Sequence, residues 1–224
     1  MTLNSRTIQD IYNHFQIPPG LQKHMYIVTM IGKYICDSWQ GPSINKQAIV
    51  TALLLHDLGN LIKFDLSENA VILDPTLHDS SWRGIQQKLI KKYGTSAHKA
   101  TLKMAKEIIT DSPTLKLIDA MDATNLEKIS QESWEHQICE YADMRVIPNG
   151  ISSLDKRLTD IHDRYQHLSP DWEDKELLTK NKIFGKKIED SLQENTIENI
   201  IFIPQRKIDS YLIELPQYII KKDN

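Results

Sequence analysis

The pattern of hydrophobic and polar positions along this chain repeats every three to four residues, as in amphipathic helices. Residues 21–39 are a clear example, with apolar side chains at positions that include Met25 and Ile31. A shorter helix is expected before them, and the Ile-Pro-Pro-Gly stretch at 17–20 separates the two. Glycine and proline lie between the periodic segments, and we expect no β-hairpin of the Asn-Gly or Asp-Gly kind. The pattern therefore predicts an all-α fold.

The same criteria predict further helices after residue 41. A strongly apolar helix follows the Pro-Ser pair at 42–43 and is expected to reach at least Leu58, where Gly59 weakens it. Residues 65–81 form a long connection, and because such connections are often functional, we expect it to border a substrate opening. The remaining expected helices cover 82–94, 95–110, 130–146 and 152–168, and the state of residues 197–204 is left open.

Length and composition favour a single large core. The chain has 224 residues, of which 40% are hydrophobic, and this is enough for one sizeable domain. We expect a main domain at 1–170 and a helical extension at 171–224 that packs on it. No internal repeat or low-complexity tract divides the chain further.

The overall charge excludes few classes of function, but it does not favour a polyanion as a binding partner. A formal net charge of -3 and a pI near 6.2 give no chain-wide attraction to nucleic acid or anionic membranes, although local basic patches stay open. We therefore expect neither a nucleic acid nor a membrane as partner. Cys36 and Cys139 each fall in an expected helix, which argues against a disulfide scaffold and favours the cytoplasm. The N-terminal residues are amphipathic, unlike a targeting segment, and no apolar run reaches the length of about 18 residues that a membrane span needs.

One apolar segment contains a histidine and an aspartate side by side. In TALLLHDLGNLIKF, residues 51–64, His56 and Asp57 interrupt a run that otherwise predicts a buried helix. Burying a carboxylate without a partner costs several kcal/mol, so Asp57 needs hydrogen bonds, a counter-charge or a metal ion. The same dipeptide occurs at 78–79 and 162–163 in polar surroundings, so the apolar context carries the signal.

The partners of this pair must come from other helices, because adjacent helical residues point about 100° apart. Three candidates lie in helices of mixed character: His24 in LQKHMYIV, His98 in SAHKATLK and Asp143 in CEYADMRV. The order of His24, the His-Asp pair and Asp143 resembles the HD-domain superfamily of metal-dependent phosphohydrolases. ALLLHDLGN and EYADMRV carry the resemblance most specifically, and it covers residues 20–165.

This resemblance implies an HD-domain-like helical bundle and one divalent metal ion bound by His24, His56, Asp57 and Asp143. It also implies hydrolysis of a phosphate ester with Asp57 taking part in catalysis, and we expect the substrate to be a nucleotide or another small phosphorylated metabolite. Two imidazoles and two carboxylates suit Mn²⁺, Fe²⁺, Co²⁺, Ni²⁺, Zn²⁺ or Mg²⁺. Such a set leaves positions of a six-coordinate ion open for water and substrate.

Further residues are candidates for catalysis or substrate binding. His98 is a catalytic candidate from the resemblance at HKATLKMA, and Lys63 is a second one as a cation close to the dipeptide. Asn60, Arg83 and Arg145 are candidates for holding the substrate, since an arginine can bind a phosphate through two hydrogen bonds. Asn60 is also a departure, because many family members carry a lysine there.

Simpler explanations exist for the same residues. Asp57 is able to pair with Lys63 and Asp143 with Arg145, and His24 alone suits an ordinary hydrogen-bonded helix histidine. The missing lysine favours a second function, a non-catalytic sensing domain that keeps the metal, and a di-iron oxygenase is a third. The oligomeric state is left open, and a homodimer is compatible with the sequence.

Overall fold

The computed structural model describes residues 5–67, 77, 81–121, 125–148, 150–165 and 174–221. These residues are mainly helical, and the only sheets among them are two short antiparallel pairs, so the all-α prediction is confirmed. The 3₁₀ helices are η1 (Asn60–Lys63) and η4 (Leu215–Gln217), and the strands are β1 (Ser5–Thr7), β2 (Val146–Ile147), β3 (Gly150–Ile151) and β4 (Ile219–Lys221). The α-helices are α1 (Ile8–His14), α2 (Pro19–Ser38), α3 (Lys46–Leu55), α4 (Ser81–Tyr93), α5 (Ala97–Ile108), α6 (Ser112–Ala120), α7 (Leu126–Ile129), α8 (Trp134–Asp143), α9 (Leu154–Tyr165), α11 (Lys175–Glu194) and α12 (Gln205–Glu214).

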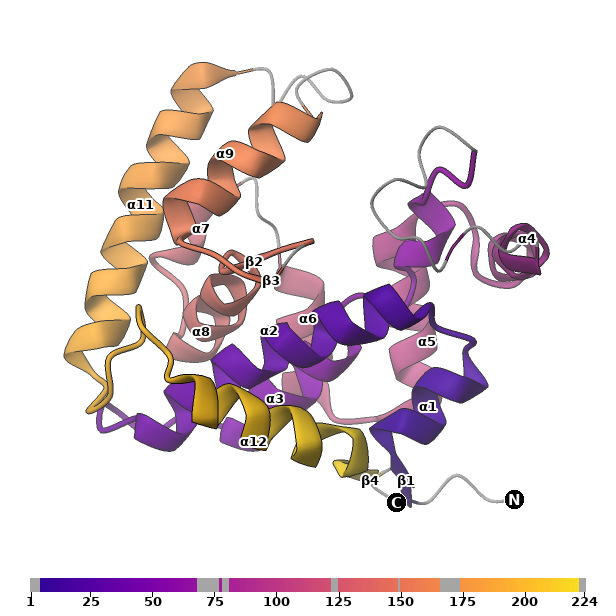
Figure 1. The fold of residues 1–224 in the computed structure, drawn as a ribbon, viewed down its shortest axis with the longest axis horizontal. Coiled ribbons are helices and arrows are strands. Elements are labelled where there is room, and N and C mark those ends of the chain that lie inside the picture. The colour runs from indigo at the N-terminus through magenta and orange to yellow at the C-terminus, as the bar shows by residue number, and fades with distance from the viewer. Residues whose placement is uncertain are drawn as a thin grey trace.

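Helices α2 and α3 lie at the centre of the fold (Figure 1). α2 contacts α3, α8 and α12, and α3 also contacts α6 and α8. Every residue of α3 from Ala48 to Leu55 is buried. A helix buried on all sides is stable only when neighbours surround it. On one side of this centre stand α9 and α11, and on the other stand α4 and α5 (Figure 1).

The C-terminal helices pack on the same core as the rest of the chain. α11 contacts α7, α8 and α9, and Ile188, Leu192 and Tyr211 of α11 and α12 belong to the common hydrophobic core. β4 pairs with β1 so that Lys221 lies opposite Ser5, and the two ends of the described chain meet (Figure 1). The boundary expected between 170 and 171 lies outside the described residues.

Helix α3 is shorter than the sequence pattern predicts. It ends at Leu55, whereas the apolar run predicted a helix that reaches Leu58. After Leu55 the backbone forms turns closed by hydrogen bonds between residues three apart. The N–H of Leu58 donates to Leu55 O (3.3 Å), and that of Asn60 donates to Asp57 O (3.0 Å). The His-Asp dipeptide therefore lies in a turn, which changes the directions its side chains can take.

The helix expected at 130–146 is also shorter, and a hairpin follows it. Ser133 caps α8, which ends at Asp143, and β2 then pairs with β3. The expectation of no hairpin was wrong. Gly150 is the first residue of β3 and pairs with Ile147, and its φ of 124° is a conformation that favours glycine.

Several other expectations concern single segments. Cys36 and Cys139 are buried and free, so they form no disulfide. His162 is buried on α9, although its polar surroundings in the sequence had indicated a solvent-facing position. Most of the 65–81 connection, including the dipeptide at 78–79, lies outside the described residues. In the part of the chain that is described, no helix has both the length and the apolar character needed to cross a bilayer.

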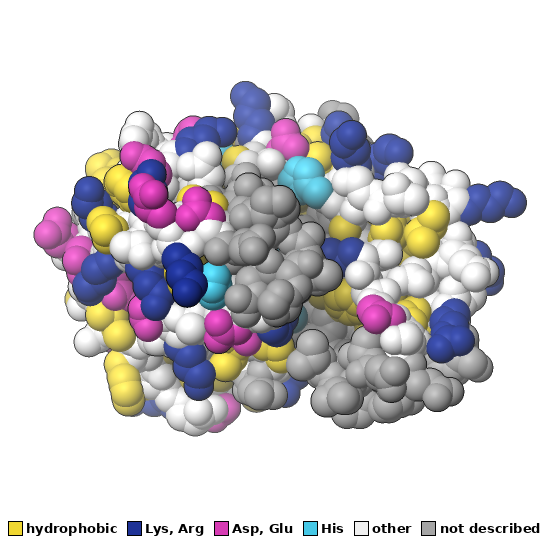
Figure 2. Space-filling view, turned by 90° about the horizontal axis from the view of Figure 1, so that it is seen from above, with side chains coloured by type: hydrophobic (Ala, Val, Ile, Leu, Met, Phe, Trp, Pro, Cys, Tyr) yellow, Lys and Arg dark blue, Asp and Glu magenta, His cyan; other side chains and the backbone are white. Residues whose placement is uncertain are grey.

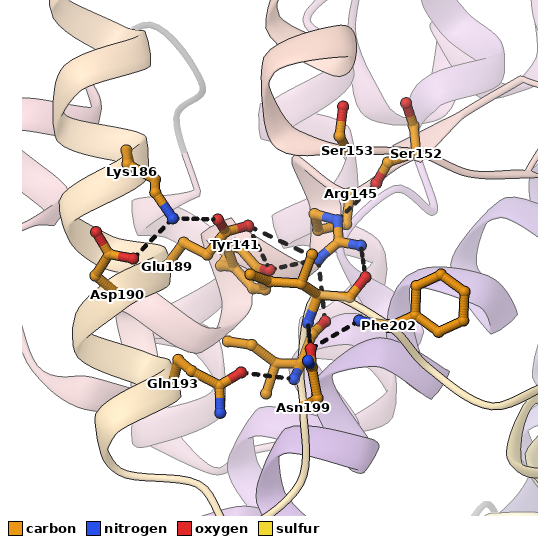
Figure 3. A network of polar contacts seen from close by, with 12 residues as sticks. Tyr141, Arg145, Ser152, Ser153, Lys186, Glu189, Asp190, Gln193, Asn199 and Phe202 are labelled. Carbon is orange, nitrogen blue, oxygen red and sulfur yellow. Dashed lines mark hydrogen bonds and ion pairs between the residues drawn. The ribbon is translucent and has the colours of Figure 1, made fainter.

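A buried polar network joins α8 to the C-terminal part of the chain (Figure 3). The guanidinium of Arg145 donates hydrogen bonds to the Tyr141 hydroxyl and to the carbonyls of Ser152 (2.6 Å), Ile200 (3.0 Å) and Ile201 (2.9 Å). Tyr141 in turn donates to Glu189 of α11 at 2.9 Å. Residues 197–204 form neither helix nor strand, so their backbone lacks the regular hydrogen bonds of such elements. The network supplies hydrogen bonds that hold this segment in place.

This geometry corrects the expectation that Arg145 holds a substrate phosphate. The Arg145 side chain is only 3% exposed, and its donors already serve carbonyls and Tyr141. A substrate would have to displace those buried bonds before it reached the guanidinium. Arg145 is therefore a structural residue of the fold.

Replacing Arg145 by methionine should lower the free energy of unfolding by about 3–5 kcal/mol, because the carbonyls lose their donor and Glu189 loses the cation that lies 3.9 Å away. The exposed Arg206 of α12 is the matched control, and its replacement by methionine should change that free energy by less than about 0.5 kcal/mol. Urea denaturation followed by circular dichroism measures both. Equal effects would show that the network contributes no more than a surface arginine does.

Candidate metal centre

Four polar side chains from three parts of the chain meet where α2, α3 and α8 contact one another. His24 lies in the N-terminal part of α2, and Asp143 is the last residue of α8. His56 and Asp57 follow α3 directly. The structure thus brings together the four residues that the resemblance named as metal ligands.

The end of α3 fixes the orientation of His56. The last carbonyls of a helix lack partners within the helix, and here two side chains supply donors. The Nδ1 atom of His56 lies 2.7 Å from Leu53 O, and the hydroxyl of Tyr12 in α1 donates to Leu54 O at 2.7 Å. Because a carbonyl only accepts, Nδ1 carries the hydrogen, and the neutral ring keeps a lone pair on Nε2. Histidine metal ligands are typically held in this way.

The two Nε2 atoms lie close to both carboxylates. That of His24 is 3.5 Å from Asp57 Oδ2 and 3.2 Å from Asp143 Oδ1. That of His56 is 3.6 Å from Asp57 Oδ2 and 3.7 Å from Asp143 Oδ1. Donor atoms of His24, His56 and Asp57 all lie within 4.8 Å of one another, so these three residues could hold a metal ion. Asp143 is not part of that group of three but contacts both histidines.

These separations resemble those of ligands that share one ion. Donor atoms about 2.1 Å from a metal are about 3.0 Å apart along an octahedral edge and about 3.4 Å apart in a tetrahedron. The four histidine–carboxylate distances run from 3.2 to 3.7 Å. A small movement of the side chains toward one centre would therefore bring the donor atoms to bonding distance.

Two buried atoms of the cluster, His56 Nε2 and Asp143 Oδ1, form no hydrogen bond with any residue that the structure describes. When the His56 ring is neutral and its hydrogen is on Nδ1, both atoms are acceptors, and they face each other across 3.7 Å. Buried polar atoms without a partner are rare and costly. A cation between them would satisfy both, so the residues present fit a metal ion.

The charges of the cluster lead to the same conclusion. Burial lowers the pKa of His56, but the charge of Asp57 and the contact with Asp143 outweigh burial and raise that pKa to about 9. Burial raises the pKa of Asp143, but the two histidines outweigh it and hold that pKa well below its usual value. The cluster therefore favours a positive charge at its centre, which a proton or a metal ion can supply.

Ordinary ion pairs do not account for the two carboxylates. Within the described ranges, no lysine or arginine nitrogen lies within 4.0 Å of Asp57 or Asp143, so the alternative pairs with Lys63 and Arg145 are not formed there.

The site is also open on one side. The side chains of His24, Asp57 and Asp143 are 22%, 22% and 20% exposed, whereas that of His56 is 4% exposed.

The turn that carries the dipeptide is held against α4 and α5. The N–H of Gly59 donates to Thr101 Oγ1 at 2.9 Å. A Cβ atom at Gly59 would lie 2.4 Å from Ala97 O and 2.7 Å from Thr101 N, which is closer than real atoms approach. Gln86 of α4 donates to Leu61 O at 2.8 Å and so holds η1. Glycine is therefore required where the turn meets α5.

The remaining candidate residues lie outside the contacts that join the four. His98 Nε2 is 3.1 Å from Asp119 Oδ1, and these side chains are 46% and 65% exposed. Arg83 is exposed and donates to a backbone carbonyl after η1 at 3.0 Å. Asn60 is buried and Lys63 is exposed, at the two ends of η1. Their roles in catalysis or substrate binding stay predictions.

Sequence reasoning missed the residues that hold the backbone of the site. Tyr12, Gln86 and Thr101 donate to or accept from the main chain around the dipeptide. None has a sequence signal, because each contact depends on how distant helices pack. Gly59 is the exception, since a glycine directly after an apolar run indicates a turn or a close backbone approach.

Comparison with known proteins finds no family model, no curated protein and no solved structure that matches this chain. Membership of the HD-domain superfamily therefore stays a prediction from two motifs. What supports the site is its own geometry.

Changing Asp143 to asparagine should weaken Mn²⁺ binding at least about tenfold, because the shape is kept while one negative charge is lost. The exposed Asp209 of α12 is the matched control, and Asp209→Asn should keep the affinity of the unchanged chain. Titration calorimetry on metal-free protein measures all three. Mn²⁺ at a hundred times its Kd should also stabilise the unchanged chain by about 2.7 kcal/mol. Equal affinities for the two variants would leave the site without Asp143.

Changing Gly59 to alanine should lower the free energy of unfolding by about 1–3 kcal/mol, because the new Cβ overlaps backbone atoms of α5. Gly84 of α4 is the matched control, since a Cβ there would meet nothing within 4 Å. Gly84→Ala should raise the free energy of unfolding by up to about 1 kcal/mol, as expected inside a helix. Effects of the same sign, measured by urea denaturation, would contradict the close approach at Gly59.

Proposed function

We propose that His24, His56, Asp57 and Asp143 bind one divalent metal ion, and that the chain hydrolyses a phosphate ester of a nucleotide or another small metabolite. The observation that carries the proposal is that His56 Nε2 and Asp143 Oδ1 lie 3.7 Å apart and form no hydrogen bond within the described part of the chain. The reaction class comes from the resemblance of ALLLHDLGN and EYADMRV to HD-domain phosphohydrolases.

The donor set limits which ion fits. Imidazole nitrogens combined with carboxylate oxygens suit Mn²⁺, Fe²⁺, Co²⁺, Ni²⁺ or Zn²⁺, whereas Mg²⁺ prefers oxygen ligands. When bound, a divalent ion would polarise a phosphoryl oxygen and lower the pKa of a water molecule. The described residues contain one group of this kind, which supports a single ion over a di-iron centre.

The protein residues then have distinct tasks. Asp57 and Asp143 together carry a charge that balances a divalent cation, so the approach of an anionic phosphate is not opposed. His56 is fixed by Leu53 O and closes the buried side, while His24 borders the solvent-exposed side. Substrate would enter past the exposed edges of His24, Asp57 and Asp143.

Two further candidate residues fit steps of the proposed reaction. Lys63 is exposed at the end of η1, so its ammonium group is free to move toward a substrate phosphate. His98 Nε2 lies 3.1 Å from Asp119 Oδ1, and this contact orients the ring. In this proposal Lys63 binds the phosphate and His98 supplies a proton to the leaving group.

A non-catalytic sensing domain is the second candidate. It is favoured by Asn60, which stands where many members of the superfamily have a lysine, and which is buried at the start of η1. An amide cannot supply the positive charge that a lysine offers to a phosphate. This candidate keeps the metal site but lacks turnover.

A hydrolysis screen separates the two candidates. We expect release of p-nitrophenol or phosphate from p-nitrophenyl phosphate or a nucleotide panel in the presence of Mn²⁺, Co²⁺ or Ni²⁺. Asp57→Ala should lower the rate at least about a hundredfold, since even residues behind metal ligands commonly account for ten- to hundredfold effects.

Asp209→Ala is the control for the loss of one exposed carboxylate and should keep the rate. Metal binding without hydrolysis of any substrate would favour the sensing domain. Hydrolysis that survives Asp57→Ala would place the chemistry elsewhere on the chain.

A further inference from the structure

Charge is distributed very unevenly along the chain. Residues 81–108, which cover α4 and α5, contain seven lysines and arginines and one acidic residue, a formal charge of +6. Since the net charge of the chain is -3, the remaining residues sum to -9. The chain-wide charge, which predicted no nucleic acid partner, therefore conceals a strongly basic segment.

The structure places these basic side chains on the surface. Figure 2 shows Lys and Arg side chains at the end of the molecule where α4 lies, with few acidic side chains among them, while the other end carries both signs mixed. All seven basic residues are exposed: Arg83, Lys88, Lys91, Lys92, Lys99, Lys103 and Lys106.

The two helices that carry these lysines pack against each other. Lys99, Lys103 and Lys106 follow the spacing of a single face of α5. Lys103 donates to the carbonyl of Tyr93 at the end of α4 (2.8 Å), and this contact joins the two sets. We call the exposed lysines of α4 and α5 the basic face.

Little of this positive charge is neutralised inside the protein. Lys92 pairs with Glu107 at 3.1 Å. No carboxylate in the described ranges lies within 4.0 Å of the other lysines of the basic face, which are Lys88, Lys91, Lys99, Lys103 and Lys106. Unpaired like charges on adjoining helices repel each other, so an external polyanion that binds there relieves this repulsion.

We propose that the basic face binds the phosphate backbone of double-stranded nucleic acid without reading its sequence. A duplex carries one negative charge per about 1.7 Å of its axis. Lysines that neutralise these phosphates release bound counterions, and this release favours binding. Lysine binds phosphate as a point charge and carries no base specificity on its own. The proposal does not rest on the metal site or its reaction.

The chemistry of the face favours a duplex over other polyanions. Single-strand binding relies on exposed aromatic rings for stacking, but Tyr93 is buried and Trp82 is half-buried. Membrane-surface helices insert exposed apolar side chains beside their basic ones. The exposed large hydrophobic residues of the described chain lie in other elements, none of them in α4 or α5.

Fluorescence anisotropy with a labelled 20-bp duplex of arbitrary sequence tests the proposal on the full chain. We expect binding whose log Kd depends on log salt, with a contribution of about 0.9 from each lysine that contacts a phosphate. Changing Lys91, Lys99 and Lys106 to glutamine should weaken binding at least about tenfold at 50 mM salt and reduce the slope by about 2 to 3.

The matched control is a triple variant with the same change of charge on α11. It replaces three exposed residues, Lys175, Lys180 and Lys187, by glutamine. It should leave affinity and slope within about a factor of two of the unchanged chain, since a purely global charge effect is small at this salt concentration. Circular dichroism checks that both triple variants keep their helices.

Five results would overturn the proposal. One is the absence of salt-dependent duplex binding by the full chain. The full chain is used so that the carboxylates of residues 65–80, which precede α4, are present in the test. A second is equal weakening by both triple variants. The other three are tighter binding, at equal charge, to a 20-nucleotide single strand, to anionic phosphatidylserine vesicles or to polyglutamate, and each would assign the basic face to another partner.

Discussion

The free carbonyls at the end of α3 are the constraint on which the candidate site depends. A helix that ends in the core needs donors for its last carbonyls, and His56 supplies one through Nδ1 to Leu53 O while Tyr12 supplies another to Leu54 O. The same hydrogen bond that satisfies the fold leaves a lone pair on His56 Nε2, opposite Asp143. The requirement of the backbone and the chemistry of the metal site are thus met by one side chain.

At the end of α8, a residue of the candidate site and a residue that stabilises the fold lie only two positions apart. Asp143 contacts the histidines of the site, whereas Arg145 turns away and bonds Ser152, Ile200 and Ile201. The two charges do not neutralise each other, although they are close in sequence. Because Arg145 is saturated by carbonyls and Tyr141, Asp143 keeps its negative charge for the histidines, which lower its pKa. The C-terminal segment at 197–204 therefore supports the site indirectly.

The sequence predicted what depends on local pattern and missed what depends on distant packing. Helical periodicity was sufficient for the all-α fold, and the apolar context of His56 and Asp57 was sufficient to single out the dipeptide. The turn at Leu55 was missed because the run stays apolar beyond it, and the donors to the last carbonyls of the helix are Tyr12 from α1 and the ring of His56. The role of Arg145 was assigned wrongly for the same reason, since its partners lie far along the chain.

Gly59 connects the candidate metal centre to the basic face. Its N–H bonds Thr101, and its missing side chain lets the first turn of α5 lie against the turn that carries the dipeptide. Lys99 stands in the same part of α5, two residues before Thr101. The candidate metal centre and the basic face therefore adjoin at this close backbone contact.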